Sequence, residues 1–176
     1  MTPGSRGTRA EVALTGDILA SYRGPGPVLR RRMAGTGDGR GEARALVTLM
    51  LACGLIFVGQ WPRLSREAHL SGQELDMLVG GALLGWLFIA PLVLYGIAGI
   101  SHVIARLFGG KATYLEARMA LFWALLAAVP FWLLWGLVAG FIGAGAALNL
   151  TGLVAFVAFL ALWLAGLYAV EFGDAA

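Results

Sequence analysis

The feature that most constrains this chain is a run of 52 residues, 119–170, that contains no Asp, Glu, Lys or Arg. Its only clearly polar side chains are Asn149 and Thr151. As one α-helix at about 1.5 Å per residue, the run would be roughly 78 Å long, more than twice the ~30 Å hydrocarbon thickness of a bilayer. The run must therefore fold back. The glycine-rich stretch 140–145 predicts the tight turn between two membrane-spanning helices.

Composition also indicates a single membrane domain. The chain is 59% hydrophobic and 13% charged, with a mean hydropathy of +0.79. Residues 1–16 carry charges and no continuous apolar stretch, so we expect the first span, not a secretory signal, to direct insertion. The single cysteine, Cys53, excludes an intrachain disulfide. Only one of the 13 basic residues is lysine, which is typical of a GC-rich bacterial genome and favours the inner membrane.

Residues 1–44 are predicted to form a cytoplasmic, partly disordered basic segment, rich in glycine and arginine. Within it, apolar residues at helical spacing over 11–22 predict a short amphipathic helix, and a basic patch follows at 28–33. Both are expected to lie on the membrane surface. The alternative is a disordered tail whose apolar stripe arises by chance.

The fold class predicted for the rest is an all-α polytopic membrane bundle of about four transmembrane helices, preceded by this short amphipathic segment. The membrane domain covers 45–170, and 171–176 form a C-terminal tail. Pro62 is expected to end the first span and to start a loop over 63–76. Capping boxes at 71–74 and 113–116 are expected to begin the second and third spans. The expected spans are 45–61, 77–107, 117–141 and 147–170.

The distribution of basic residues predicts the orientation. Eleven of them fall in the N-terminal segment and in the connection between the second and third spans, whereas only Arg63 and Arg66 fall on the other side. The positive-inside rule therefore places both termini in the cytoplasm. A fifth span would move the C-terminus outside without changing this count, so the choice between four and five spans stays open.

The chain lacks the patterns typical of enzymes and cofactor sites. No HExxH, CxxC or paired-carboxylate spacing occurs, and the glycine-rich stretch 35–41 lacks the Lys-Ser/Thr of a phosphate loop. We therefore expect no catalysis, no cofactor and no metal. His69 and His102 are predicted to lie on opposite sides of the membrane. His102 is the candidate polar group inside a span, either as a packing or headgroup-facing residue or with a ligand or proton role.

Two prolines and two glycine pairs fall inside predicted spans. Pro91 and Pro130 should each kink a helix, which is either a structural feature or a break of the kind that transporters use at binding sites. Glycines four residues apart, at 81 and 85 and at 136 and 140, allow close helix contacts. Those contacts form either within the chain or between copies, so a homo-oligomer is possible.

The candidate contact residues lie before the membrane domain. Arg30, Arg31, Arg32 and Tyr22 are expected to meet anionic lipid headgroups at the cytoplasmic face, or a membrane or cytoplasmic protein partner. Each basic residue near such a surface contributes about 1 kcal/mol of attraction. Lipid explains this patch better than nucleic acid does.

The sequence resembles the Yip1 family of integral membrane proteins over about residues 21–170. The resemblance rests on Ser21-Tyr22-Arg23-Gly24-Pro25-Gly26-Pro27, on Leu107-Phe108-Gly109-Gly110-Lys111-Ala112-Thr113-Tyr114, and on the stretch from Phe122 to Pro130. In that family a Gly-Gly hinge, here Gly109 and Gly110, leads into a helix whose first half ends in proline. Family members often have five spans, whereas four are counted here.

The resemblance implies a non-enzymatic membrane scaffold or adaptor. Eukaryotic members act in vesicle trafficking with small GTPases. Because the composition of this chain is typical of bacteria, we assign none of its residues to GTPase binding. Two other hypotheses come from the residues themselves. One is a small transporter or channel subunit that uses the proline-kinked spans, and the other is a membrane-embedded enzyme acting on lipid.

Overall fold

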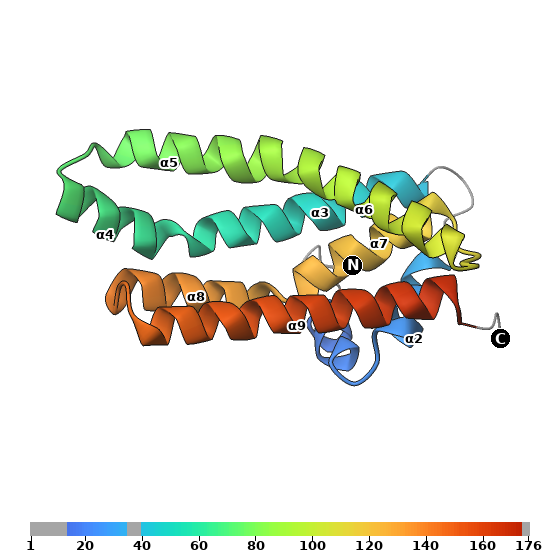
Figure 1. The fold of residues 1–176 in the computed structure, drawn as a ribbon. Helices are drawn as coiled ribbons and strands as arrows, with labels where there is room; N and C mark the ends of the chain where they lie inside the picture. Colours follow the sequence, from blue (N-terminus) through green and yellow to red (C-terminus); the bar gives the residue numbers. More distant parts are fainter. Residues whose placement is uncertain (1–13, 35–39, 174–176) are drawn as a thin grey trace, which may run out of the picture.

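The computed structural model describes residues 14–34 and 40–173, and these form helices and turns without any β-strand (Figure 1). Residues 14–21 are helical and precede the other elements. Those elements are α2 (Pro25–Met33), α3 (Arg40–Gly59), α4 (Trp61–Ser71), α5 (Leu75–Leu84), the π-helix η1 (Gly85–Ile89), α6 (Ala90–Leu107), α7 (Tyr114–Ala127), α8 (Val129–Phe141) and α9 (Ala146–Glu171).

Three helical segments in the described part of the chain are long and apolar enough to cross a membrane: 40–71, 75–107 and 146–171. Helices α7 and α8 make a fourth if this bent pair counts as one span. The expected all-helical architecture is therefore confirmed, with three to four apolar helices compatible with a multi-pass membrane protein.

The predicted outer loop is mostly helical. Pro62 lies in the first turn of α4, where a proline's missing N–H removes no helical hydrogen bond, so the chain continues as helix to Ser71. The loop predicted over 63–76 was therefore wrong except at its end. The capping box at 71–74 was also wrong, because the Ser71 hydroxyl donates to the Glu67 carbonyl inside α4. Glu74 precedes α5 without a side-chain cap.

The second predicted capping box is confirmed at the start of α7. The Thr113 hydroxyl oxygen accepts the Glu116 N–H at 3.3 Å, and the Glu116 carboxylate accepts the Thr113 N–H at 2.6 Å. These two bonds satisfy backbone donors that a helix start leaves without partners.

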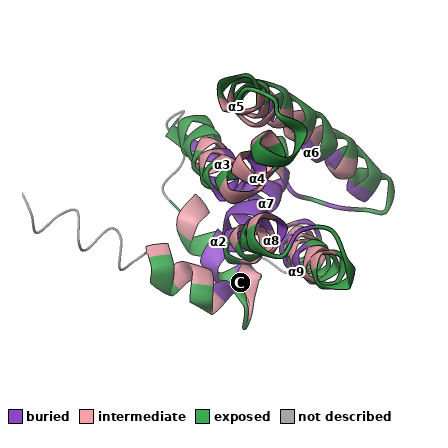
Figure 2. Ribbon diagram, turned by 90° about the vertical axis from the view of Figure 1, so that its left-hand side faces the viewer, coloured by how far each residue is buried: buried purple, intermediate pink, exposed green. Residues whose placement is uncertain are grey.

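Helix α7 lies at the centre of the bundle, in contact with α3, α6 and α9 (Figure 2). Its side chains from Met119 to Ala127 are all buried, and Phe122 and Trp123 are among the largest fully buried residues. A helix that is apolar on every face suits either a protein core or a membrane span, and α7 takes the first of these positions. The first part of the charge-free run therefore forms the core, while α9, in its second part, lies at the periphery.

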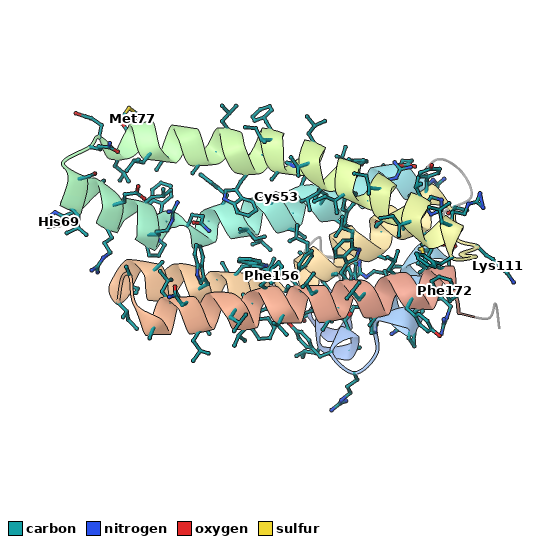
Figure 3. The ribbon with its side chains drawn as sticks, viewed as in Figure 1. Cys53, His69, Met77, Lys111, Phe156 and Phe172 are labelled. Atoms are coloured by element: carbon teal, nitrogen blue, oxygen red, sulfur yellow. The ribbon has the colours of Figure 1, made fainter. Side chains whose placement is uncertain are left out.

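The two ends of the bundle differ. We call the end with the α4–α5 and α8–α9 turns the hairpin end, and the end with the α6–α7 connection and the C-terminus of α9 the terminal end (Figure 1). Figure 3 places His69 and Met77 at the hairpin end and Lys111 and Phe172 at the terminal end. At the hairpin end, Arg66 donates to the Gly140 carbonyl at 3.2 Å and links α4 to α8.

The two glycine pairs have different surroundings. A methyl group added at Gly136 would overlap the Gly59 carbonyl, and one at Gly140 would overlap Pro62, so these glycines allow α8 to pack tightly against the α3–α4 segment. Beyond their own helix backbone, Gly81 and Gly85 have no heavy atom of the described residues within 4 Å of the corresponding positions. Of the two pairs, Gly136 and Gly140 are therefore the one that packs closely against another part of the described chain.

The two prolines also act differently. Next to Pro130, the helix direction bends by 44° between α7 and α8. Pro91 instead follows the five-residue π-helix η1, and residues 75–107 continue as one helical segment. A π-helical turn changes the hydrogen bonding next to a proline and is itself a common place for a helix to bend, so Pro91 alters the local hydrogen-bond pattern without interrupting the helical segment.

Candidate functional site: an arginine-rich surface at the terminal end

The N-terminal helices, residues 14–21 and α2, pack onto the bundle. Val28 and Leu29 are fully buried in the main core cluster, and Leu14 and Ile18 pack against it. A methyl group at Gly26 would lie 2.9 Å from the Ala169 side chain, so α2 approaches α9 closely. The helix predicted over 11–22 is present over its described part, 14–21, and the predicted basic patch at 28–33 is also helical, as part of α2. The apolar residues of both helices contact the bundle core, where contact with a membrane surface was expected.

Trp123 of α7 joins both N-terminal helices. Its indole N–H donates to the Ser21 hydroxyl at 2.8 Å, and the Arg32 guanidinium lies 3.9 Å above its ring centre. Arg32 also donates from Nε and Nη2 to Oδ2 of Asp17, at 3.1 and 2.8 Å. A cation–π contact combined with a two-nitrogen ion pair fixes the guanidinium's orientation. Of the predicted lipid contacts, Arg32 is thus held within the protein.

Tyr22 holds the bend between α7 and α8. Its hydroxyl donates to the Ala127 carbonyl at 2.6 Å, while the Phe131 N–H bonds to Ala128 one residue further on. The proline bend therefore frees the Ala127 carbonyl, and Tyr22 supplies its donor. Burial raises the pKa of the Tyr22 phenol. The tyrosine predicted as a partner contact has a structural bond here, although 41% of the residue remains exposed.

The remaining arginines of α2 are exposed. Arg30 and Arg31 lie on the surface, and Arg31 Nη1 is 3.8 Å from Asp17 Oδ1. Between α2 and α3 lies a groove of about 500 Å³, which we call the arginine groove. Its lining residues come from α2, α3 and α7: Arg31, Arg32, Arg40, Ala43, Arg44, Val47, Thr48 and Met119.

His102 and Glu171 form a buried pair at the terminal end. His102 Nδ1 lies 2.8 Å from Glu171 Oε1, and the two side chains are 2% and 0% exposed. The other carboxylate oxygen, Oε2, accepts the Ala112 N–H at 3.1 Å. The Lys111 N–H donates to the Glu171 carbonyl at 3.0 Å. These contacts fasten the end of α9 to the α6–α7 connection.

Gly109 and Gly110, predicted as a hinge, lie at the end of α6 and begin the α6–α7 connection. Gly109 has φ +89°, and the N–H groups of Gly109 and Gly110 return to the carbonyls of Arg106 and Ala105. This is the Schellman pattern that ends a helix. A methyl group at Gly110 would overlap the Glu171 carboxylate, so the second glycine allows that carboxylate to approach.

Sequence reasoning singled out His102 and missed Glu171, Asp17 and Trp123. The His102 ring is buried, packs against Tyr114 and contacts Glu171, which is the packing role that the sequence offered as one alternative. The sequence did contain a feature that could have revealed Glu171. It is the first charged residue after the 52-residue run, and a carboxylate at the end of a span needs a partner. The predicted topology places His102 at the same, cytoplasmic end of the second span.

A second cavity, of about 530 Å³, lies between the helices near Pro91 and Pro130, and His102 is not part of its lining. In the described residues, no group of three His, Cys, Asp or Glu side chains could hold a metal ion. The cavity is lined almost entirely by apolar and aromatic residues: Arg63, Ala82, Gly85, Trp86, Ile89, Ala90, Val93, Leu94, Leu125, Trp132, Phe156 and Phe159.

No family model, curated protein or solved structure matches this chain.

Proposed function

We propose that this chain is a non-enzymatic, multi-pass membrane protein of the Yip1 type that acts as a scaffold or adaptor. It organises protein partners or lipids at the membrane surface on the side of its terminal end. By the distribution of basic residues, that face is cytoplasmic, both termini lie on it, and the membrane is a bacterial inner membrane.

One observation carries the proposal: a folded basic surface is built onto the end of the apolar bundle. The Asp17–Arg32–Trp123 network and the buried residues of α2 fix the N-terminal helices, while Arg23, Arg30 and Arg31 stay exposed. A surface that is already ordered loses less conformational entropy on binding than a disordered tail does. Recognition of a partner or a lipid headgroup is the role that such a surface suits.

The resemblance to the Yip1 family supports this proposal at two places. Gly109 and Gly110 form a tight turn that leads into α7, and α7 ends just before the bend at Pro130. Both features match the hinge and the proline-terminated half-helix on which the resemblance rests.

The test is in-cell photo-crosslinking from the exposed positions 23 and 30, each carrying a photoreactive amino acid. We expect a discrete protein partner or an anionic lipid to be captured. Position 69, exposed at the hairpin end, is the control and should capture a different set. Recovery of neither class from 23 and 30, or of the same products from 69, would contradict the proposal.

A further inference from the structure

We propose that the arginine groove binds the phosphate of an anionic phospholipid, whose acyl chains lie along the exposed face of α3. This inference rests on the proposed function and names the lipid class that the basic surface recognises.

The charges in the groove are unbalanced. Arginines reach it from two elements, Arg31 and Arg32 from α2 and Arg40 and Arg44 from α3. The one carboxylate in ion-pair contact with these groups in the described chain is that of Asp17, which bonds Arg32 and lies 3.8 Å from Arg31. A phosphate suits such a site, because planar guanidinium groups bind phosphate oxygens through paired hydrogen bonds.

The two α3 arginines are available to a ligand. In the part of the chain that the structure describes, neither Arg40 nor Arg44 forms an ion pair with a carboxylate. Arg44 donates to the Arg32 carbonyl at 3.4 Å, a long contact at the surface. Because Arg32 is already held by Asp17 and Trp123, one wall of the groove is rigid before any ligand binds.

The exposed face of α3 is charged at its start and apolar along the rest, as a phospholipid is charged at its headgroup and apolar along its acyl chains. Arg40 and Arg44 lie one turn apart at its start, and an exposed apolar stripe continues from them at helical spacing. Its members are Val47, Leu51, Leu55 and Val58, which are 65%, 39%, 36% and 60% exposed. A soluble anion would use the arginines alone, whereas a phospholipid uses the arginines and the stripe together.

The size of the groove is compatible with a headgroup. Its volume of about 500 Å³ falls within the range of small-ligand sites. Val47 belongs to both the groove and the apolar stripe, so the phosphate site and the acyl-chain surface are continuous.

The experiment measures binding of phosphatidylglycerol to the full-length protein in phosphatidylcholine nanodiscs. The variant Arg40→Gln/Arg44→Gln should weaken binding by roughly tenfold or more, since it removes charge-assisted hydrogen bonds. The control is Arg106→Gln/Lys111→Gln, which removes the same charge from exposed positions at the same end but outside the groove. Equal losses in both variants, or none in the first, would overturn the groove as the site.

A second arm separates lipid from soluble anion. Inorganic phosphate and the water-soluble glycerophosphoglycerol headgroup should fail to displace phosphatidylglycerol. Displacement by either at concentrations comparable to the lipid would assign the arginines to a soluble ligand and overturn the proposal.

Two further measurements deal with misfolding and with the scaffold role. If the double glutamine variant loses its helical circular dichroism, the variant Arg40→Lys/Arg44→Lys takes its place. Lysine keeps the charge but lacks the paired hydrogen bonds of arginine, so weaker binding is again expected. Wild-type affinity in that folded variant overturns the groove. If positions 23 and 30 still capture a protein while phosphatidylglycerol binds no better than phosphatidylcholine, the lipid site fails and the scaffold stands.

Discussion

At the scale of single residues, most polar groups that enter the apolar bundle have a specific partner. Trp123 bonds Ser21, Tyr22 bonds the carbonyl freed by the proline bend, and Glu171 bonds both His102 and the α6–α7 connection. A polar atom without a partner in apolar surroundings costs free energy, so each of these contacts selects one arrangement of the chain. The residues that sequence reasoning assigned to outside partners are partly used inside the molecule.

Tyr22→Phe tests the bond at the helix bend. The variant keeps the ring but leaves the Ala127 carbonyl without its donor, and we expect it to lower the free energy of unfolding by about 1 kcal/mol. Unfolding in mixed detergent micelles measures this change. Tyr168→Phe is the matched control, because Tyr168 is exposed and should lose nothing. An equal effect of the two substitutions would refute a structural role for the Tyr22 hydroxyl.

His102→Ala tests the buried pair. The substitution leaves the Glu171 carboxylate buried without its imidazole partner, which should cost about 3–5 kcal/mol of stability. His69→Ala, at an exposed position on α4, should be nearly neutral. In a double-mutant cycle with Glu171→Gln, the combined loss should be smaller than the sum of the single losses. Strict additivity would mean that the two side chains do not interact.

At the scale of elements, the same residue type has different effects on different helices. Gly136 and Gly140 let α8 contact the α3–α4 segment, whereas Gly81 has open space around it. Pro130 bends its helix, whereas Pro91 follows a π-helical turn within a continuous segment. The four-residue spacing is the same in both glycine pairs, so the neighbouring helices decide which pair packs closely.

Gly136→Ala tests the crossing of α3 and α8. The added methyl group would overlap the Gly59 carbonyl, and relieving that overlap should cost about 1–3 kcal/mol of unfolding free energy. Gly81→Ala adds the same methyl group where nothing lies within 4 Å, and alanine's better helix propensity should leave stability unchanged or slightly higher. Thermal unfolding in detergent compares the two variants. A stable Gly136→Ala protein would contradict the close contact.

At the scale of the whole molecule, the basic residues are divided unevenly between the two ends. Arg63 and Arg66 belong to α4, which leads to the hairpin end, whereas α2 with its arginines and the start of α3 lie toward the terminal end (Figure 1). Lys111 lies at the terminal end too (Figure 3). The helices between the two ends are long and apolar enough to cross a membrane, and the proposed orientation follows from the asymmetry of the basic residues.

Single-cysteine labelling tests that orientation. Cys53 is buried, so a Cys53→Ala background removes the native thiol, and Lys111→Cys or His69→Cys is then introduced. A membrane-impermeant maleimide should label residue 111 only in inside-out vesicles and residue 69 only in right-side-out vesicles. Labelling of both positions from one side would refute the proposed arrangement.

Features that depend on neighbouring residues in the chain and on solvent could be predicted from the sequence alone. The charge-free run and its glycine turn predicted a helical hairpin, and the Thr113–Glu116 capping box placed the start of α7 correctly. Tertiary packing set which helix lies at the centre. Both α7 and α9 lack charges along most of their length, so no polar face reveals that one is enclosed and the other peripheral. It also decided the pairing of Tyr22 with Ala127 and of His102 with Glu171, 105 and 69 residues apart, because such contacts exist only once the helices have packed.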